Sequence, residues 1–204
     1  NADAQAGGSL KYDRKRIERT AGGCAGKTAV RRKGIMHGIT LCIPGGDVIS
    51  LRHLVLDYNG TLAAGGKLLP GVAERLRTLT KSLQIHVLTA DTYGGAKGNL
   101  KSELEQELDS GRIAVAVLTG NPSVSGAREK LTFIQKLGEK SCCAVGNGVI
   151  DKLMLEAAGL SICVMGPEGC SPGAFSVSDI CVSDICDALD LLINPHGCVA
   201  TLRE

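Results

Sequence analysis

Short apolar runs alternate with polar, turn-forming residues along the chain from Ile39 onward. Two of these runs, at 39–43 and 48–51, flank Pro-Gly-Gly-Asp and predict a β-hairpin. The later runs are short and bounded by turn-forming residues, which predicts strands in place of helices. The strands predicted after the hairpin are 53–57, 85–89, 113–118, 142–145, 162–165 and 180–182.

Between these strands, apolar side chains recur at the three- and four-residue spacing of an amphipathic helix. One such stripe consists of Val72, Leu76, Leu79 and Leu83, and Pro70 suits the first position of that helix. The predicted helices are 70–83, 100–108, 130–137, 151–160 and 185–193. Strands that alternate with helices through short links favour right-handed crossovers and a parallel sheet with helices on both faces. The predicted fold class is therefore α/β, a Rossmann-like three-layer fold with a central parallel sheet and an N-terminal β-hairpin.

The first strand after the hairpin leads into a tight polar turn. Residues 53–56 read His-Leu-Val-Leu, and residues 57–61 read Asp-Tyr-Asn-Gly-Thr. Asn-Gly also favours a two-residue turn between antiparallel strands, so this segment alone leaves both interpretations open. The alternation of strands and helices downstream favours the end of a central parallel strand. Ligands bind beyond the carboxyl ends of such strands, so the residues after each apolar run are the candidate functional residues.

The first 36 residues differ in composition from the rest of the chain. They carry nine Lys or Arg against three Asp or Glu, whereas residues 37–204 carry 14 against 18. They also lack a sustained apolar period, so we expect a basic, disordered leader at 1–36 and one α/β domain at 37–204. A second hypothesis is that Met36 is the natural start, because residues 31–35 match an in-frame translation of a purine-rich ribosome-binding site.

Within this leader, Gly26-Lys27-Thr28 resembles the end of a phosphate-binding loop. The pattern requires an earlier glycine, where this chain has Ala21, and a preceding apolar strand, where the chain is charged. A phosphate-binding loop is therefore not predicted here.

The composition indicates the cellular compartment and excludes some classes of partner. Nine cysteines are scattered through the sequence without a Cys-x-x-Cys pair, which favours free thiols in a reducing cytoplasm over a disulfide framework or a zinc site. No apolar run approaches the roughly 20 residues that cross a bilayer, so no membrane contact is predicted. Aromatic residues make up 2% of the chain, which disfavours nucleic acid as a partner because stacking rings are scarce.

Three strand ends and one helix carry a set of motifs. They are Asp-Tyr-Asn-Gly-Thr at 57–61, Thr-Ala-Asp at 89–91, Lys130, and Gly-Asn-Gly-Val-Ile-Asp at 146–151. Together and in this order, the motifs resemble those of the haloacid dehalogenase superfamily, and are most similar to its soluble P-type-ATPase-like hydrolases. The resemblance covers residues 38–204 and leaves the leader outside.

The resemblance implies phosphoryl transfer through the side chain of Asp57. That carboxylate would be the nucleophile and would form an aspartyl-phosphate. Mg²⁺ would be held by Asp57, the backbone carbonyl of Asn59 and Asp151, with help from Asn147. These are the oxygen ligands that Mg²⁺ accepts while it keeps several waters.

The resemblance also implies a phosphate-binding set. Thr89 would donate a hydrogen bond to a phosphoryl oxygen, as would the backbone N–H groups of Gly60 and Thr61. Lys130 would balance the charge of the nucleophile and the phosphate, and Arg128, two residues away, is the alternative cation. Each of these residue types alone is more often a turn former, a solvated charge or a strand-end hydroxyl, so the assignment depends on their joint placement.

The sequence departs from the superfamily pattern at three positions. Asn59 stands where phosphatases of the superfamily carry a general acid and base, and an amide cannot lend a proton. Asn147 stands where many members have Asp, and Ile150 where related sequences usually have Asn. These departures predict weak Mg²⁺ binding and slow turnover, with Asp91 as a candidate substitute acid. A catalytically weakened phosphate-binding or regulatory domain of the same fold is the alternative function.

Only 31 residues separate Asp57 from Thr89, and the next crossover is similarly short, so neither connection has room for a cap domain. The resemblance implies that a capless site acts on large substrates or is closed by a neighbouring subunit. The expected substrate is a phosphorylated small molecule or macromolecule, and the expected assembly is a homo-oligomer. Neither ATP binding nor ion pumping is implied.

Overall fold

The computed structural model describes residues 37–90, 95–118 and 126–203. The predictions for the leader at 1–36 and for Asp91 as a substitute acid fall outside these residues. Within the described part of the chain, no helix has the length and apolar character needed to span a bilayer.

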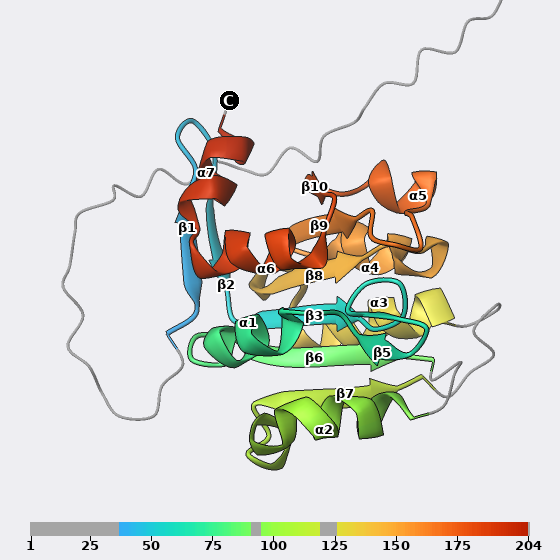
Figure 1. Cartoon of the computed structure of the whole chain (residues 1–204). Helices are drawn as coiled ribbons and strands as arrows, with labels where there is room; N and C mark the ends of the chain where they lie inside the picture. The colour runs from blue at the N-terminus through green and yellow to red at the C-terminus, as the bar shows by residue number, and fades with distance from the viewer. Residues whose placement is uncertain (1–36, 91–94, 119–125, 204) are drawn as a thin grey trace, which may run out of the picture. The chain divides into compact units, whose positions relative to one another are not determined.

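A six-stranded parallel sheet forms the centre of the domain (Figure 1). Its spatial order is β10-β9-β8-β3-β6-β7. The strands are β3 (His53–Asp57), β6 (Gln84–Thr89), β7 (Ile113–Val117), β8 (Cys142–Gly146), β9 (Leu160–Val164) and β10 (Ile180–Val182). The predicted central parallel sheet is confirmed, and β3 pairs with β6 and β8 in place of folding back into a hairpin.

The position of β3 explains why the motifs meet. From β3 the chain runs outward to β6 and β7, and then returns to β8 on the other side of β3. Asp57 lies opposite Leu88 of β6, so Thr89 extends one residue beyond it. On the other side, Leu56 lies opposite Val145 of β8. A reversal of this kind opens a crevice at the carboxyl end of the strands where it occurs.

Helices cover both faces of the sheet. On one face, α1, α2 and α6 contribute to the larger hydrophobic cluster, and on the other, α3, α4 and α5 contribute to the smaller one. In Figure 1, α1 and α6 lie in front of the strands and α3 lies behind. The helices are α1 (Val72–Leu79), α2 (Ala96–Asp109), α3 (Gly126–Leu137), α4 (Lys152–Ala157), α5 (Pro172–Phe175), α6 (Ile185–Ile193) and α7 (His196–Leu202), with 3-10 turns η1 (Glu139–Ser141) and η2 (Val149–Asp151).

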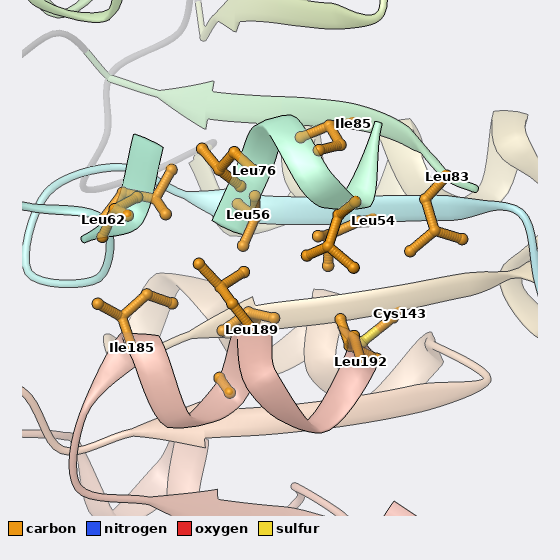
Figure 2. Close-up of a cluster of buried hydrophobic side chains, with 14 of the residues drawn as sticks. Leu54, Leu56, Leu62, Leu76, Leu83, Ile85, Cys143, Ile185, Leu189 and Leu192 are labelled. Atoms are coloured by element: carbon orange, nitrogen blue, oxygen red, sulfur yellow. The ribbon is translucent and has the colours of Figure 1, made fainter. Parts of the chain in front are cut away.

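Aliphatic side chains from strands and helices fill the larger cluster (Figure 2). Leu54 and Leu56 of β3 face Leu76 of α1 and Leu189 of α6, and all four are fully buried. Val55, between the two strand leucines, belongs to the cluster on the opposite face, as strand alternation requires. Full burial of one such side chain contributes about 1.5–3 kcal/mol. The packing of β3 on both faces therefore fixes the place of Asp57 at its end.

Two small antiparallel pairs accompany the sheet. β1 (Ile39–Cys42) and β2 (Val48–Leu51) form the predicted N-terminal hairpin. β4 (Ala63–Ala64) and β5 (Lys67–Leu68) pair within the connection from β3 to β6. That connection is described throughout and contains only this pair and α1. It is capless, as predicted.

Four of the five predicted helices differ from the observed ones at one or both ends. They are 70–83 (α1), 100–108 (α2), 130–137 (α3) and 151–160 (α4), whereas 185–193 has the bounds of α6. Helix α1 begins at Val72 instead of Pro70, because Gly71 has a left-handed φ of 79° and cannot continue a helix. The predicted helix 151–160 ends early, and its last residue belongs to β9. There, Ala158 has an extended backbone (ψ 154°), and the Gly159 N–H donates to the carbonyls of Glu139 and Cys142 instead of continuing the helix. The hydrophobic pattern predicts neither α5 nor α7.

Candidate active site

Asp57 ends β3, and the residues after it, 58–63, form a tight loop, called here the Asp57 loop. The Tyr58 carbonyl accepts backbone hydrogen bonds from within this loop, and the Tyr58 hydroxyl donates to the Gly66 carbonyl at 2.8 Å. Gly60 has a φ of 79°, a conformation that glycine adopts without strain. The loop therefore holds a largely buried Asp57 carboxylate, 7% exposed, at the carboxyl edge of the sheet.

Lys130 of α3 bridges two carboxylates. Its ammonium group donates to Asp57 Oδ1 at 2.5 Å and to Asp151 Oδ1 at 2.6 Å, and the lysine side chain is fully buried. Arg128, the alternative cation, is exposed on the same helix. The structure thus brings together three of the predicted site residues from β3, α3 and η2.

Burial and shared charge shift the protonation equilibria of this cluster. Burial, and next the repulsion from Asp151, raises the pKa of Asp57 to about 7, although Lys130 and Thr61 act in the opposite direction. Burial alone would lower the pKa of Lys130, but attraction to the two carboxylates outweighs it and raises that pKa above its ordinary value. Lys130 therefore stays protonated, and a second cation near Asp57 would favour the ionised carboxylate.

The second oxygen of Asp151 fixes the loop that follows β8. Asp151 Oδ2 accepts hydrogen bonds from the backbone N–H groups of Asn147 at 3.1 Å and Gly148 at 2.8 Å. Gly146 leaves room for this arrangement, because a Cβ there would lie 2.6 Å from the carboxyl carbon of Asp151. Both Asp151 oxygens are thus engaged by Lys130 and by backbone N–H groups. A metal bound to Asp151 Oδ1 would lie beside the Lys130 ammonium, and repulsion between the two cations would weaken its binding.

Thr61 and Asn147 connect the Asp57 loop to the loop after β8. Thr61 Oγ1 lies 3.2 Å from Asp57 Oδ2 and 3.3 Å from Asn147 Oδ1, so two acceptors share its single proton. Asn147 Nδ2 donates to the Gly169 carbonyl at 2.9 Å. Thr89, which is buried at the end of β6, lies at the same edge of the sheet. Both threonines predicted to bind phosphate therefore lie at the edge of the sheet that carries Asp57.

The donor atoms around Asp57 are mainly oxygens, which suits Mg²⁺. Asn59 Oδ1 is buried without a hydrogen-bond partner, and a bound cation or donor would satisfy such an acceptor. Across the described ranges, no group of three or more His, Cys, Asp or Glu side chains is arranged to hold a metal. A Mg²⁺ ion would therefore depend on Asp57, on oxygens of Asn59 and Asn147, and on water. This donor set fits a weakly held ion.

One segment of the site is missing from the sequence-based prediction. The loop between β9 and α5 lies against the Asp57 loop, since a Cβ on Gly166 would be 3.0 Å from the Gly60 carbonyl oxygen. Glu168 Oε2 lies 3.0 Å from the position of a Cβ on Gly60. This loop follows the predicted strand 162–165 at the same edge of the sheet. The loop carries no residue of the motifs. The only sequence signal that could have identified it is its place after a predicted strand, because ligands bind beyond the carboxyl ends of parallel strands.

Two proteins of Methanocaldococcus jannaschii are similar in sequence to parts of this chain, and no family model matches it. The uncharacterized protein MJ0073 of Methanocaldococcus jannaschii is 44% identical over 79 residues, which cover 85% of that protein and 37% of this chain. The uncharacterized protein MJ0072 of the same organism is 49% identical over 39 residues, which cover 89% of that protein and 19% of this chain. Neither name states an activity.

Solved structures with a similar fold include phosphatases. A 3-deoxy-D-manno-octulosonate 8-phosphate phosphatase from Moraxella catarrhalis, in complex with magnesium and phosphate ions, has a TM-score of 0.53 at 16% identity and covers 74% of this chain and 90% of its own. A Legionella pneumophila protein described as a subfamily III A hydrolase of the haloacid dehalogenase superfamily has a TM-score of 0.53 at 14% identity, with coverages of 74% and 87%.

A third similar structure shows phosphoserine phosphatase as an analogue of its phospho-aspartyl intermediate. It has a TM-score of 0.50 at 14% identity, and the match covers 70% of this chain and 99% of that chain. At such identities the likeness establishes the fold. The chain belongs to the family of the M. jannaschii protein MJ0073 and has the fold of haloacid dehalogenase superfamily hydrolases.

Proposed function

We propose that this chain is a Mg²⁺-dependent phosphohydrolase that acts through an aspartyl-phosphate on Asp57. The observation that carries the proposal is the buried Lys130 ammonium between Asp57 and Asp151 at the carboxyl edge of the sheet. Burying three ionisable groups in contact is a poor way to stabilise a fold, because desolvation offsets the attraction between their charged forms. A reactive site explains the arrangement better. The phosphatases of the same fold support this reaction class.

In the first step, a carboxylate oxygen of Asp57 attacks the phosphorus of a phosphate ester. A new O–P bond forms while the bond from phosphorus to the leaving oxygen breaks, and the leaving oxygen takes its proton from water. Lys130 neutralises charge at the carboxylate and the phosphoryl group, and Thr61 and Thr89 donate hydrogen bonds to phosphoryl oxygens. Mg²⁺, when bound by Asp57 and the oxygens of Asn59 and Asn147, would supply further positive charge to the phosphoryl group.

In the second step, water attacks the phosphorus of the aspartyl-phosphate. The O–P bond to Asp57 breaks, inorganic phosphate leaves, and the carboxylate is regenerated. Asn59 can orient this water through its amide but cannot accept the proton. Loss of a positioned general acid and base slows a reaction by about 10²- to 10⁴-fold. We therefore expect hydrolysis of the aspartyl-phosphate to be slow.

The test is the release of inorganic phosphate from a panel of phosphate esters in the presence of Mg²⁺. Wild type is compared with Asp57→Asn, which keeps the size of the side chain and removes the nucleophile. We expect wild type to hydrolyse at least one ester and the variant to hydrolyse none. Equal phosphate release by both proteins across the panel would contradict the proposal.

The second candidate function is a phosphate-binding or regulatory domain that has lost most turnover. The neutral side chains at Asn59 and Asn147, in a site that keeps Lys130 buried between two carboxylates, favour it. Under either function, beryllium fluoride with Mg²⁺ would raise the melting temperature of wild type but not that of Asp57→Asn. Repeated turnover of a phosphate ester distinguishes the enzyme from the binding domain.

A further inference from the structure

The loop between β9 and α5, residues 165–171, brings one more carboxylate to the site. A Cβ on Gly60 would lie 2.6 Å from Asn147 Nδ2 and 3.0 Å from Glu168 Oε2. The Asn147 amide and the Glu168 carboxylate therefore converge on one point, three residues along the chain from Asp57. Glu168 is exposed, so its charge is accessible to whatever enters the site from solvent.

Asn147 ties this loop to the site with two hydrogen bonds. Its Nδ2 donates to the Gly169 carbonyl at 2.9 Å, and its backbone carbonyl accepts from the Ser171 N–H at 2.8 Å. A carbonyl oxygen can only accept, so the group that faces Gly169 has to be the amide nitrogen. An ionised Asp at this position would place an oxygen against that carbonyl. The amide that reduces the charge of the site is thus also the group that holds the Glu168 loop.

We infer that Glu168 supplies negative charge that favours a divalent cation at the site, and that Asn147 is the positioning residue for it. The inference rests on the proposed Mg²⁺-dependent function. The charge of the two buried carboxylates is already partly compensated, because Asp57 and Asp151 share the Lys130 ammonium. Asp151 is also engaged by two backbone N–H groups, and positions 59 and 147 are amides. An exposed carboxylate acts on a nearby divalent ion through solvent, so its effect is moderate and decreases with ionic strength.

The first test is calorimetric titration of the full chain with Mg²⁺ alone. Glu168→Gln keeps the shape of the side chain and removes its charge. We expect it to raise the dissociation constant by about three- to tenfold at low salt, and by less as salt increases. The matched control is Glu105→Gln on α2, where Glu105 is exposed and pairs with Lys101. We expect this control to bind Mg²⁺ as wild type does.

Three outcomes would overturn the assignment of Glu168. They are an unchanged dissociation constant in Glu168→Gln, an equal loss in Glu105→Gln, or a wild type that does not bind Mg²⁺. Circular dichroism and a cooperative melt would establish that each variant is folded before it is titrated.

The second test isolates the role of Asn147 with a double-mutant cycle. In an Asn147→Ala background the loop loses its side-chain anchor, so Glu168→Gln is expected to change the Mg²⁺ dissociation constant by less than about twofold. Asn147→Ser serves as the background if Asn147→Ala fails to fold. If Glu168→Gln changes the Mg²⁺ dissociation constant by the same factor in the Asn147-variant background as in wild type, Asn147 does not position Glu168.

Phosphate release separates this inference from the proposed function. If Mg²⁺ binding depends on Glu168 but wild type releases no more phosphate than Asp57→Asn, the proposed function fails and the inference stands. If wild type hydrolyses phosphate esters and Glu168→Gln binds Mg²⁺ as wild type does, the inference fails and the proposed function stands.

Discussion

The two halves of the site satisfy their polar groups in different ways. In the charged half, Lys130 is buried between Asp57 and Asp151 and binds an oxygen of each. In the amide half, Asn59 Oδ1 has no partner among the described residues. The Asn147 amide accepts a hydrogen bond from Thr61 and donates one to the Gly169 carbonyl. On the proposed function, the charged half forms and holds an aspartyl-phosphate, and the amide half lacks the group that would speed its hydrolysis.

The largest expected effect comes from removing the cation of the charged half. Lys130→Met leaves two carboxylates buried without their shared ammonium, and breaking such a pair destabilises a protein by about 3–5 kcal/mol. We also expect phosphate release to disappear. Urea unfolding and the phosphate assay measure the two effects. The control is Lys136→Met on the exposed face of the same helix, and a similar loss in both variants would show that the charged half has no special role.

The amide half predicts a change in the opposite direction. Asn59→Asp restores a group that can give and take a proton, so we expect phosphate release to become at least about tenfold faster. The initial rate with the best ester of the panel measures this gain. Asn194→Asp, at an exposed position after α6, introduces the same chemical change away from the site. A folded Asn59→Asp protein with an unchanged rate would contradict the account of the slow step.

A pair of histidines beside α3, with His86 buried and His53 half-buried, contrasts with the charged half. His53 Nδ1 and His86 Nε2 lie 3.2 Å apart, and the His86 ring packs edge-on against Phe133 of α3. Burial, followed by the charge of His53, lowers the pKa of His86 to about 4. Between pH 6.5 and about 4, the His86 imidazole is protonated in the unfolded chain but stays neutral in the folded chain. The free energy of unfolding therefore decreases as the pH falls toward 4.

This effect is measured by urea unfolding of wild type and His86→Leu at pH 7 and pH 4.5. We expect wild type to lose about 2 kcal/mol more than the variant over this interval, less than the full shift because solvent reaches the half-buried His53 beside the ring and screens the added charge. Asp57 titrates with the opposite sign in the same range, since its pKa is raised, but it is present in both proteins and its contribution cancels. Equal pH dependence of both proteins would contradict the prediction.

The smallest effect tests the close packing of the amide half. Gly60→Ala and Gly65→Ala both place a side chain at positive φ, 79° and 55°, and we expect each to lose about 1–2 kcal/mol for that reason. Only the Cβ at Gly60 would also meet Asn147, at 2.6 Å, whereas Gly65 has open space around it. We therefore expect Gly60→Ala to be less stable than Gly65→Ala by about 1 kcal/mol in urea unfolding. Equal free energies of unfolding for the two variants would show that the Asn147 side chain moves aside without loss of stability, and would contradict the prediction.

The spacing of apolar residues predicts most of the helices and strands, because these residues are the ones that pack in the core. The helix predicted at 185–193 and the strand at 180–182 have the observed boundaries, since the apolar residues in these segments form the core. The start of α1 is not predicted correctly, because the backbone angle of Gly71 decides it and no pattern reports that angle. The alternation of strands and helices predicts a parallel sheet, which places Asp57, Thr89 and Asn147 at one edge, whereas the order of the strands is known only from the structure.

The candidate site is predicted less completely. Motif order identifies Asp57, Lys130 and Asp151, which the structure brings into contact. It does not reveal that Asp151 is already engaged by the N–H groups of its own loop, because that depends on the conformation around Gly146. It also misses Glu168, whose place follows from packing between loops that are far apart in sequence.

The most direct measurement of the central claim is mass spectrometry of the protein after acid quench of a reaction with p-nitrophenyl phosphate and Mg²⁺. Acid preserves an acyl-phosphate that slow hydrolysis allows to accumulate. The account predicts a phosphoryl group on the peptide that contains Asp57, and none on that peptide in Asp57→Asn. Release of p-nitrophenol without phosphorylation of Asp57, or the same phosphorylation in Asp57→Asn, would contradict the account.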